Sequence, residues 1–197
     1  METIMIGKIE KNLMLVESVV NLLRSNLHLK TELQMAAQCC INCIKSGNKI
    51  LLAGNGGSAA DAQHIAGEFV SRFLFDRPGL PAIALTTDTS IITAIGNDYG
   101  YDNVFSRQLQ AIGRKGDVII AYSTSGKSKN IIKVLSKAAD IGINRIGMTG
   151  DLDSEMVGLC DYCLKVPSQS TPRIQECHLI LGHILCGLVE DSLFNRE

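Results

Sequence analysis

Five short apolar segments alternate with stretches of helical character, and this alternation limits the fold more than any other feature of the chain. The segments are rich in aliphatic and β-branched residues and read KILLAG, PAIALTT, DVIIAYSTSG, NRIGMTG and DYCLKV. Helices are expected between them over residues 58–73, 90–94, 103–112 and 128–141. Strands that alternate with helices form a parallel sheet covered on both faces. The sequence therefore predicts an α/β protein, a three-layer αβα sandwich with a five-stranded parallel sheet.

Helices are also expected at both ends of the chain. Apolar residues recur at helical spacing near the start, at Ile9, Leu13, Val16, Val20 and Leu23. A second helix is expected over residues 30–45 and a last one over about residues 171–194. The last helix contains LILGHILCGLV, which is shorter than the roughly 20 apolar residues that span a bilayer. A short helix that is apolar all round is normally buried, so we expect it to pack against another subunit.

These elements fit one domain. A chain of 197 residues is long enough for a single α/β core with helical extensions. We predict a single domain over residues 1–197. The N-terminal helices would occupy residues 1–46, and the α/β core with the C-terminal helix would occupy residues 48–197.

Composition excludes several classes of partner. The formal net charge is -1, which gives no overall basic signal for nucleic acid. The first residues, METIMIGKIEKNLMLVE, mix charged and apolar side chains and lack the continuous apolar stretch of a signal peptide. The seven cysteines are an odd number and are expected to be reduced thiols. We expect a cytoplasmic protein that binds neither nucleic acid nor a membrane.

Two CxxC pairs, Cys40/Cys43 and Cys160/Cys163, imitate the spacing of a zinc ribbon. The first pair falls inside a helical segment, and neither pair has the glycine of a zinc knuckle. We therefore interpret these cysteines as small core residues rather than as a metal or redox site.

A glycine cluster follows the first apolar segment, at Gly54-Asn55-Gly56-Gly57-Ser58-Ala59. It fits GxGxxA, a variant of the dinucleotide-binding fingerprint. That fingerprint needs an acid at the end of the second strand, about 20 residues on. Asp76 precedes that strand and Asp88 comes much too late. A tight strand-to-helix turn, in which glycine supplies a positive φ, is the better interpretation.

A second loop, STSGKS (residues 123–128), also follows an apolar strand and opens a helix. Hydroxyls and free backbone N–H groups at a helix N-terminus form an anion site. A single serine would suffice as an ordinary helix cap. Three serines and a threonine within six residues favour phosphate binding, and the Walker A pattern is absent.

His64 and Glu68 lie four residues apart and so share one face of a helix. They could bind a divalent metal, act as an acid–base pair, or simply form a solvated hydrogen bond. Gln175 and His183 on the last helix are further candidates, since a buried histidine needs a partner. They are eight residues apart, about 12 Å along a helix. They can serve one centre only if their side chains lean together or if two subunits contribute.

Taken in order, the motifs GNGGSAADAQH, AIGNDYG, FSRQ, STSGKS and RIQECH resemble the sugar isomerase (SIS) family and, within it, the phosphoheptose isomerases. The resemblance covers about residues 48–194. It implies a homotetramer of flavodoxin-like subunits with active sites at subunit interfaces.

The resemblance also implies roles for individual residues. The phosphate site falls on Ser123, Thr124, Ser125 and Ser128. Contacts to the sugar fall on Asn55, Gly56, Gly57, Asn97 and Asp98, with Glu68 and Gln175 also at the substrate. One zinc ion per subunit would be held by His64, Glu68, Gln175 and His183. The acid–base pair would be Glu68 and His183.

The implied reaction converts D-sedoheptulose 7-phosphate into D-glycero-D-manno-heptose 7-phosphate through an enediolate. This is the first step toward ADP- or GDP-heptose for lipopolysaccharide or capsule. The alternative is a non-catalytic SIS tetramer that binds the replication initiator DnaA. Such proteins lack the glutamate found here as Glu68 and carry arginine in place of Ser125, so both positions favour the isomerase. Arabinose 5-phosphate isomerases share the phosphate loop but commonly append regulatory domains, for which no residues remain.

Overall fold

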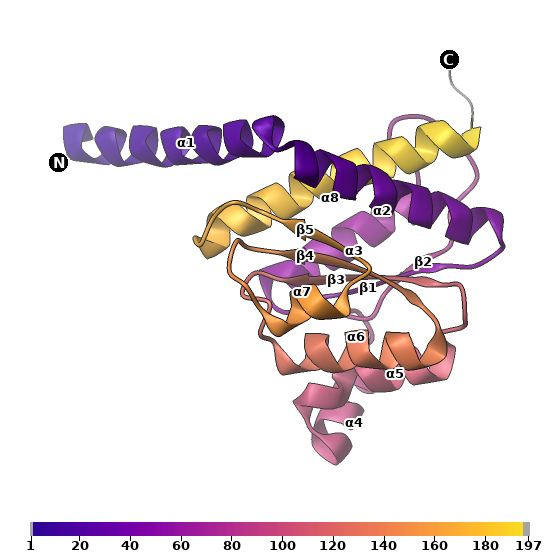
Figure 1. Ribbon diagram of the computed structural model, residues 1–197. Helices are drawn as coiled ribbons and strands as arrows, with labels where there is room; N and C mark the ends of the chain where they lie inside the picture. Colours follow the sequence, from indigo (N-terminus) through magenta and orange to yellow (C-terminus); the bar gives the residue numbers. More distant parts are fainter. Residues whose placement is uncertain (1, 195–197) are drawn as a thin grey trace.

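The computed structural model describes residues 2–194 and contains a five-stranded sheet in which every neighbouring pair is parallel (Figure 1). The spatial order is β2-β1-β3-β4-β5, which is the flavodoxin-like order of a doubly wound sheet. The strands are β1 (Ile50–Ala53), β2 (Ala82–Ala84), β3 (Val118–Ser123), β4 (Asn144–Thr149) and β5 (Tyr162–Lys165). Each lies within one of the five predicted segments, so the predicted sheet is confirmed.

Helices cover both faces of the sheet, as predicted (Figure 1). One face carries α1 (Glu2–Ser25), α2 (Leu27–Lys45), α3 (Gly57–Val70) and α8 (Thr171–Phe194). The other carries α4 (Thr89–Tyr99), the 3-10 helix η1 (Tyr101–Asn103), α5 (Val104–Ile112), α6 (Lys129–Ile141) and α7 (Glu155–Leu159). Two differences from expectation stand out. Helix α4 continues five residues beyond the predicted end at residue 94, and α7 was not predicted, because five residues are too few to show a helical period.

The core is divided by the sheet into two apolar clusters, one on each face. All residues of β1 and β3 are buried, because helices cover both sides and leave no solvent-facing positions. Cys40 and Cys43 belong to the cluster under α2, whereas Cys160 packs against the opposite cluster. The two CxxC pairs therefore lie on opposite faces of the sheet and cannot share a metal ion. All seven cysteines lie in the described part of the chain and are free thiols.

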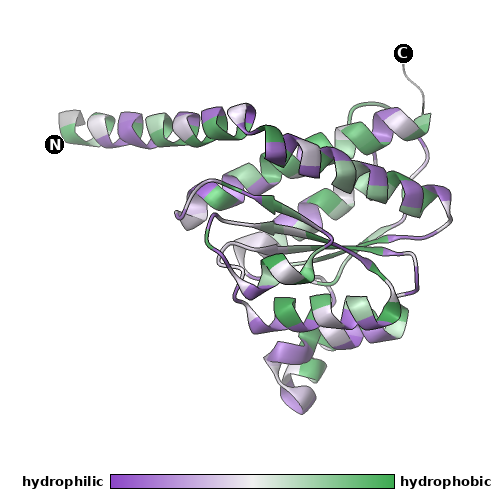
Figure 2. Ribbon diagram, viewed as in Figure 1, coloured by the Kyte–Doolittle hydropathy of each residue, from purple (hydrophilic) through white to green (hydrophobic). Residues whose placement is uncertain are grey.

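Helix α1 projects away from the body of the molecule (Figure 1). Only near its C-terminal end does it bury apolar side chains, Val19 and Leu23. Figure 2 shows hydrophobic residues along the projecting part. They are at least about half exposed and comprise Ile4, Met5, Ile6, Ile9, Leu13, Met14 and Leu15. The predicted helix is confirmed, but the apolar residues of its projecting part are not covered within this chain.

Helix α8 is long and apolar enough, by length and composition alone, to cross a membrane. In this structure it packs against α2 and α3 and buries nine of its residues, including Ile174, Leu181, Leu185 and Val189. Its place is that of a core helix, so the expected burial is confirmed, but the described contacts are made within its own chain. The expected packing of this helix against another subunit stays a prediction.

His178 on α8 is fully buried, and its ring lies edge-on to Tyr122 of β3 with 5.8 Å between the centroids. Burial lowers the pKa of His178 to about 4. The unfolded chain therefore binds a proton at this position below about pH 6.5, while the folded chain does not until about pH 4. The stability that the neutral ring contributes is complete above pH 6.5 and is lost as pH falls toward 4.

We expect His178→Phe to make the stability of the fold less sensitive to acid, because phenylalanine keeps an aromatic ring at this position but has no group that takes up a proton. Between pH 7.5 and 4.5 the variant should lose less stability than the wild type, by up to about 3 kcal/mol. Urea unfolding at both pH values measures this. His28→Phe, at an exposed position of α2, is the control. Equal pH dependence in the His178 variant and the wild type would contradict the prediction.

Candidate active site

The glycine loop joins β1 to α3 and is shaped by two requirements. Gly56 has φ +57°, as expected for a tight turn. Gly57 lies beneath the side chain of Gln175, and a Cβ at Gly57 would stand 2.5 Å from Gln175 Nε2. The turn and this close approach account for both glycines without a dinucleotide, which agrees with the interpretation from sequence.

Asn55 connects the glycine loop to the phosphate loop. Its side-chain amide exchanges two hydrogen bonds with that of Asn130 in α6, at 2.9 and 2.8 Å. Tyr101 donates a third hydrogen bond to Asn55 Oδ1 at 3.1 Å. Asn130 is buried, so the paired amides fix the two loops relative to each other. Sequence reasoning missed Asn130, although its position two residues beyond Ser128 could have drawn attention to it.

The phosphate loop gathers its hydroxyls at the start of α6. Ser123 Oγ accepts a hydrogen bond from Gly126 N at 3.1 Å and lies 3.2 Å from Ser128 Oγ. Ser128 occupies the N-cap position, yet its side chain makes no capping hydrogen bond. Ser125 is exposed. Ordinary capping therefore does not explain Ser128, and the arrangement of hydroxyls at the N-terminus of a 13-residue helix suits an anion.

His64, Glu68 and His183 form one cluster. The Nε2 atoms of His64 and His183 are 2.8 Å apart, and His64 Nε2 is 3.2 Å from Glu68 Oε1. One ligand atom from each residue lies within 4.8 Å of the other two. Among the side chains that the structure describes, those of residues 4–194, this is the one group of three or more histidine, cysteine or acidic residues assembled this closely. The side chain of His64 is 45% exposed and that of Glu68 is 23% exposed, so the cluster is open to solvent.

A close helix contact brings these residues together. Helices α3 and α8 run side by side in the same direction, since Gly57 meets Gln175 at one end and Phe73 meets Gly187 at the other. At the centre, a Cβ on Gly182 would lie 2.6 Å from Ile65 Cδ1. Glycine at residue 182 therefore allows α8 to approach α3 closely enough for the adjacent His183 to reach His64.

Gln175 stands apart from this cluster within one chain. It lies over Gly57, at the first turn of α3, whereas His64 is seven residues further along that helix. Along α8 it is eight residues, about 12 Å, from His183. The contact of Gln175 with Gly57 favours the second arrangement left open by the sequence, in which two subunits contribute, and that arrangement stays a prediction.

The two predicted sugar contacts on α4 are also separate from the cluster. Asn97 and Asp98 are exposed and hydrogen-bond to each other, with 2.7 Å from Asn97 Nδ2 to Asp98 Oδ1. Helix α4 lies on the face of the sheet opposite α8 (Figure 1). Their role at the sugar stays a prediction.

The donor chemistry of the cluster fits zinc. Two imidazole nitrogens and one carboxylate are ligands that Zn²⁺ commonly takes, and catalytic zinc sites keep a further position open. The exposure of His64 leaves room for such a position. These residues therefore suit the metal that the sequence resemblance implies.

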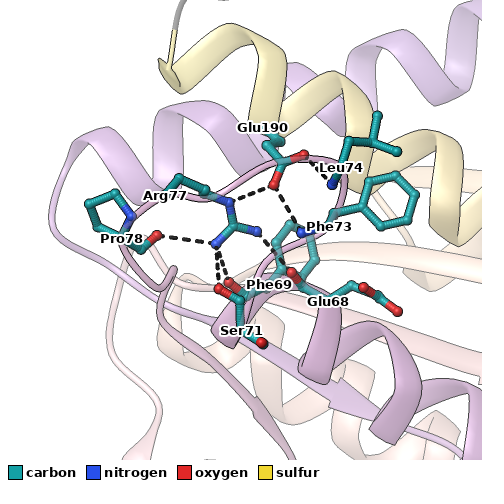
Figure 3. A network of polar contacts seen from close by, with 8 residues as sticks. All are labelled: Glu68, Phe69, Ser71, Phe73, Leu74, Arg77, Pro78 and Glu190. Atoms are coloured by element: carbon teal, nitrogen blue, oxygen red, sulfur yellow. Dashed lines mark hydrogen bonds and ion pairs between the residues drawn. The ribbon is translucent and has the colours of Figure 1, made fainter.

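A buried ion pair lies beside the cluster and was not predicted from the sequence. Arg77, in the loop after α3, contacts Glu190 of α8 with 2.8 Å between Nε and Oε1 (Figure 3). The two side chains are 2% and 0% exposed. They are 113 residues apart in the chain, so no local pattern could have paired them.

The family model described as SIS domain matches residues 16–150. The chain belongs to the SIS family. Among curated proteins, this SIS protein is 64% identical to the phosphoheptose isomerase of Burkholderia pseudomallei (strain 1710b) over 169 residues, which covers 86% of each chain. It is 63% identical to that of Aneurinibacillus thermoaerophilus over 165 residues, covering 84% of this chain and 83% of the relative.

Solved structures agree with these relatives. The phosphoheptose isomerase of Neisseria gonorrhoeae superposes with a TM-score of 0.89 at 38% identity, covering 96% of this chain and 100% of that one. That of Francisella tularensis gives a TM-score of 0.90 at 33% identity, covering 94% and 98%. The predicted family, the fold and the class of enzyme, a phosphoheptose isomerase, are confirmed.

Proposed function

We propose that this SIS protein converts D-sedoheptulose 7-phosphate into D-glycero-D-manno-heptose 7-phosphate, a precursor step for lipopolysaccharide or capsule. The observation that carries the proposal is the cluster of His64, Glu68 and His183, in a chain that also carries the hydroxyl-rich phosphate loop. A sugar phosphate needs both an anchor for its phosphate and proton-transfer groups at its carbonyl end. The enzyme class of the relatives supports the same assignment.

The phosphate end of the substrate would bind the hydroxyls of Ser123, Thr124, Ser125 and Ser128 and the N-terminus of α6. Asn55, Gly56 and Gly57, together with Asn97 and Asp98, would contact the sugar. Binding energy from the remote phosphate can orient the reacting carbons next to the catalytic groups. The link between Asn55 and Asn130 would keep the two ends of the site at a fixed separation.

Isomerisation moves one proton between C1 and C2 and another between their oxygens. The carbon acid is weak, so the reaction needs a positioned base and stabilisation of the charge that develops on oxygen. We assign the proton transfers to Glu68 and His183. Both touch His64, which places them on the same side of the site.

We further propose one zinc ion per subunit, held by His64, Glu68 and His183. When bound, zinc supplies Lewis-acid polarisation of the sugar oxygens. Gln175, the fourth ligand implied by the family, lies over Gly57 in its own chain. It would complete the set from a neighbouring subunit, and it would then also stand next to the substrate.

A homotetramer is the assembly we propose. The uncovered apolar residues along α1 support it, because a soluble monomer rarely exposes a contiguous apolar strip of this length. The whole chain, residues 1–197, would act as a single SIS domain in the cytoplasm, where its seven free cysteines would stay reduced.

The experiment that tests the function is a proton NMR time course with sedoheptulose 7-phosphate in heavy water, with added zinc or with a chelator. Appearance of an aldose heptose 7-phosphate carrying deuterium from the solvent is the expected result. Loss of turnover in the chelator would place a metal in the site. Unchanged sedoheptulose 7-phosphate that still binds would overturn the proposal in favour of a non-catalytic sugar-phosphate-binding role.

The phosphate assignment makes a separate prediction. Ser125→Ala combined with Ser128→Ala should raise KM for the sugar phosphate at least about tenfold, because each hydroxyl lost is a hydrogen bond to a charged group. The effect on kcat should be smaller. Steady-state kinetics measures both, with Ser136→Ala as control, since that exposed serine bonds only its own helix at Ile132 O. An unchanged KM would show that the substrate phosphate does not bind at Ser125 and Ser128.

A further inference from the structure

The Arg77–Glu190 pair holds the end of α3 against α8 through a buried network (Figure 3). Besides Glu190, Arg77 donates hydrogen bonds to four backbone carbonyls. They are those of Glu68 at 2.8 Å, Phe69 at 2.8 Å, Pro78 at 3.1 Å and Ser71 at 3.4 Å. Glu190 in turn accepts hydrogen bonds from the backbone N–H groups of Phe73 at 3.0 Å and Leu74 at 2.8 Å. Every charged atom of the pair is therefore engaged away from solvent.

On the α3 side, this network includes a hydrogen bond to the backbone of Glu68. The Arg77 guanidinium donates from Nη2 to the backbone carbonyl of Glu68. Figure 3 shows the Glu68 carboxylate pointing away from Arg77 while its carbonyl faces the guanidinium. Arg77 thus fixes the backbone from which the carboxylate projects, without touching the carboxylate itself.

On the α8 side, the network reaches His183 through the ring of Phe73. Glu190 holds the backbone of Phe73, and the Phe73 ring lies 5.4 Å from the His183 ring, centroid to centroid. The same ring also passes 3.6 Å from the position of a Cβ on Gly187. Glu190 follows His183 by seven residues, nearly two helical turns, so the two lie on the same side of α8.

We infer that Arg77, Glu190 and Phe73 are positioning residues for the isomerase site, which set the distance and orientation of Glu68 on α3 relative to His183 on α8. The inference rests on the proposed roles of Glu68 and His183. None of the three positioning residues contacts the phosphate loop in the described structure. Their effect should therefore fall on kcat and on metal affinity rather than on KM.

Arg77→Lys is the first test, because lysine keeps the charge beside Glu190 but cannot bond a carboxylate and four carbonyls at once. We expect kcat to fall at least about tenfold and the zinc dissociation constant to rise about tenfold, as when outer contacts to metal ligands are lost. KM for sedoheptulose 7-phosphate should change less than about threefold. Isothermal titration calorimetry with zinc alone gives the zinc affinity. Circular dichroism checks that the variant is still folded at the assay temperature.

Arg145→Lys is the matched control. Arg145 also makes a two-bond ion pair, to Asp161, with 3.1 Å from Nε and 2.6 Å from Nη2, but this pair joins β4 to the turn before β5. It should leave kcat and zinc affinity within about twofold. Activity could instead fall in both Arg77→Lys and Arg145→Lys, and only in proportion to the fraction of protein that is unfolded. That result would show that Arg77 acts on stability alone and would overturn the inference.

Phe73→Leu decides the matter if Arg77→Lys does not fold. Leucine keeps an apolar side chain but removes the ring next to His183, and kcat should fall at least about threefold with little change in KM. Glu68→Gln separates this inference from the proposed function. Activity retained in Glu68→Gln would reject the proposed site itself. The other outcome is that Glu68→Gln loses activity while folded Arg77→Lys and Phe73→Leu keep the kcat and zinc affinity of the wild type. That outcome would reject only the positioning roles.

Discussion

Glu68→Gln should lower kcat at least about 100-fold while the chain remains folded, in line with the loss of a general base. Glutamine has nearly the same shape and can keep a contact with His64, which lies 3.2 Å from Glu68 Oε1. It cannot accept a proton, and as a neutral ligand it binds a divalent cation less well. The substitution therefore removes the base and also the negative charge that balances the metal ion, and both losses lower kcat.

Solvent exchange and turnover should be measured on the same samples of Glu68→Gln. The NMR time course in heavy water reports deuterium incorporation at the substrate carbon, so it detects proton abstraction even when little product accumulates. Glu10→Gln, an exposed position on α1, is the control for loss of a carboxylate. Near-normal turnover in the folded Glu68 variant would remove Glu68 from the catalytic assignment. Near-normal exchange with little turnover would instead assign the carbon proton to His183 and leave Glu68 with the proton on oxygen.

The part of the site that lies on one helix or in one loop could be predicted from the sequence. His64 and Glu68 are neighbours because residues four apart share a helical face, and the hydroxyls of residues 123–128 are adjacent along the chain. The order of the strands and of the longer helices followed from the hydrophobic pattern, whereas the five-residue helix α7 did not. These features depend on short-range geometry, which a sequence carries directly.

Pairings between distant elements could not be predicted. That His183 of the same chain reaches His64 depends on how closely α8 approaches α3 at Gly182, and helical spacing says nothing about that approach. For the same reason the position of Gln175 over Gly57 was not foreseen. Arg77 and Glu190 give no signal either, since an arginine in a loop and a glutamate near a chain end are usually solvated.

Glu190→Ala should destabilise the folded chain by about 3–5 kcal/mol, because it leaves the Arg77 charge buried without a partner. The backbone N–H groups of Phe73 and Leu74 would also lose their acceptor. Urea unfolding at fixed protein concentration measures the change, since self-association also affects apparent stability. Asp161→Ala is the control. It removes the carboxylate from a pair whose side chains are 22% and 35% exposed, and it should change stability by no more than about 1 kcal/mol.

The pH dependence of the same pair gives an independent check on that prediction. Burial alone would raise the pKa of Glu190, but hydrogen bonds from Leu74, Phe73 and Arg77 outweigh it and hold the pKa below its ordinary value. A carboxyl with a lowered folded pKa stabilises the fold above its unfolded pKa and loses that contribution as pH falls through the folded value. The stability difference between wild type and Glu190→Gln should therefore be constant near neutral pH and shrink below about pH 4.5. A difference that stays the same down to the acid limit of folding would mean that shape and hydrogen bonding at residue 190, rather than its charge, stabilise the contact between α3 and α8.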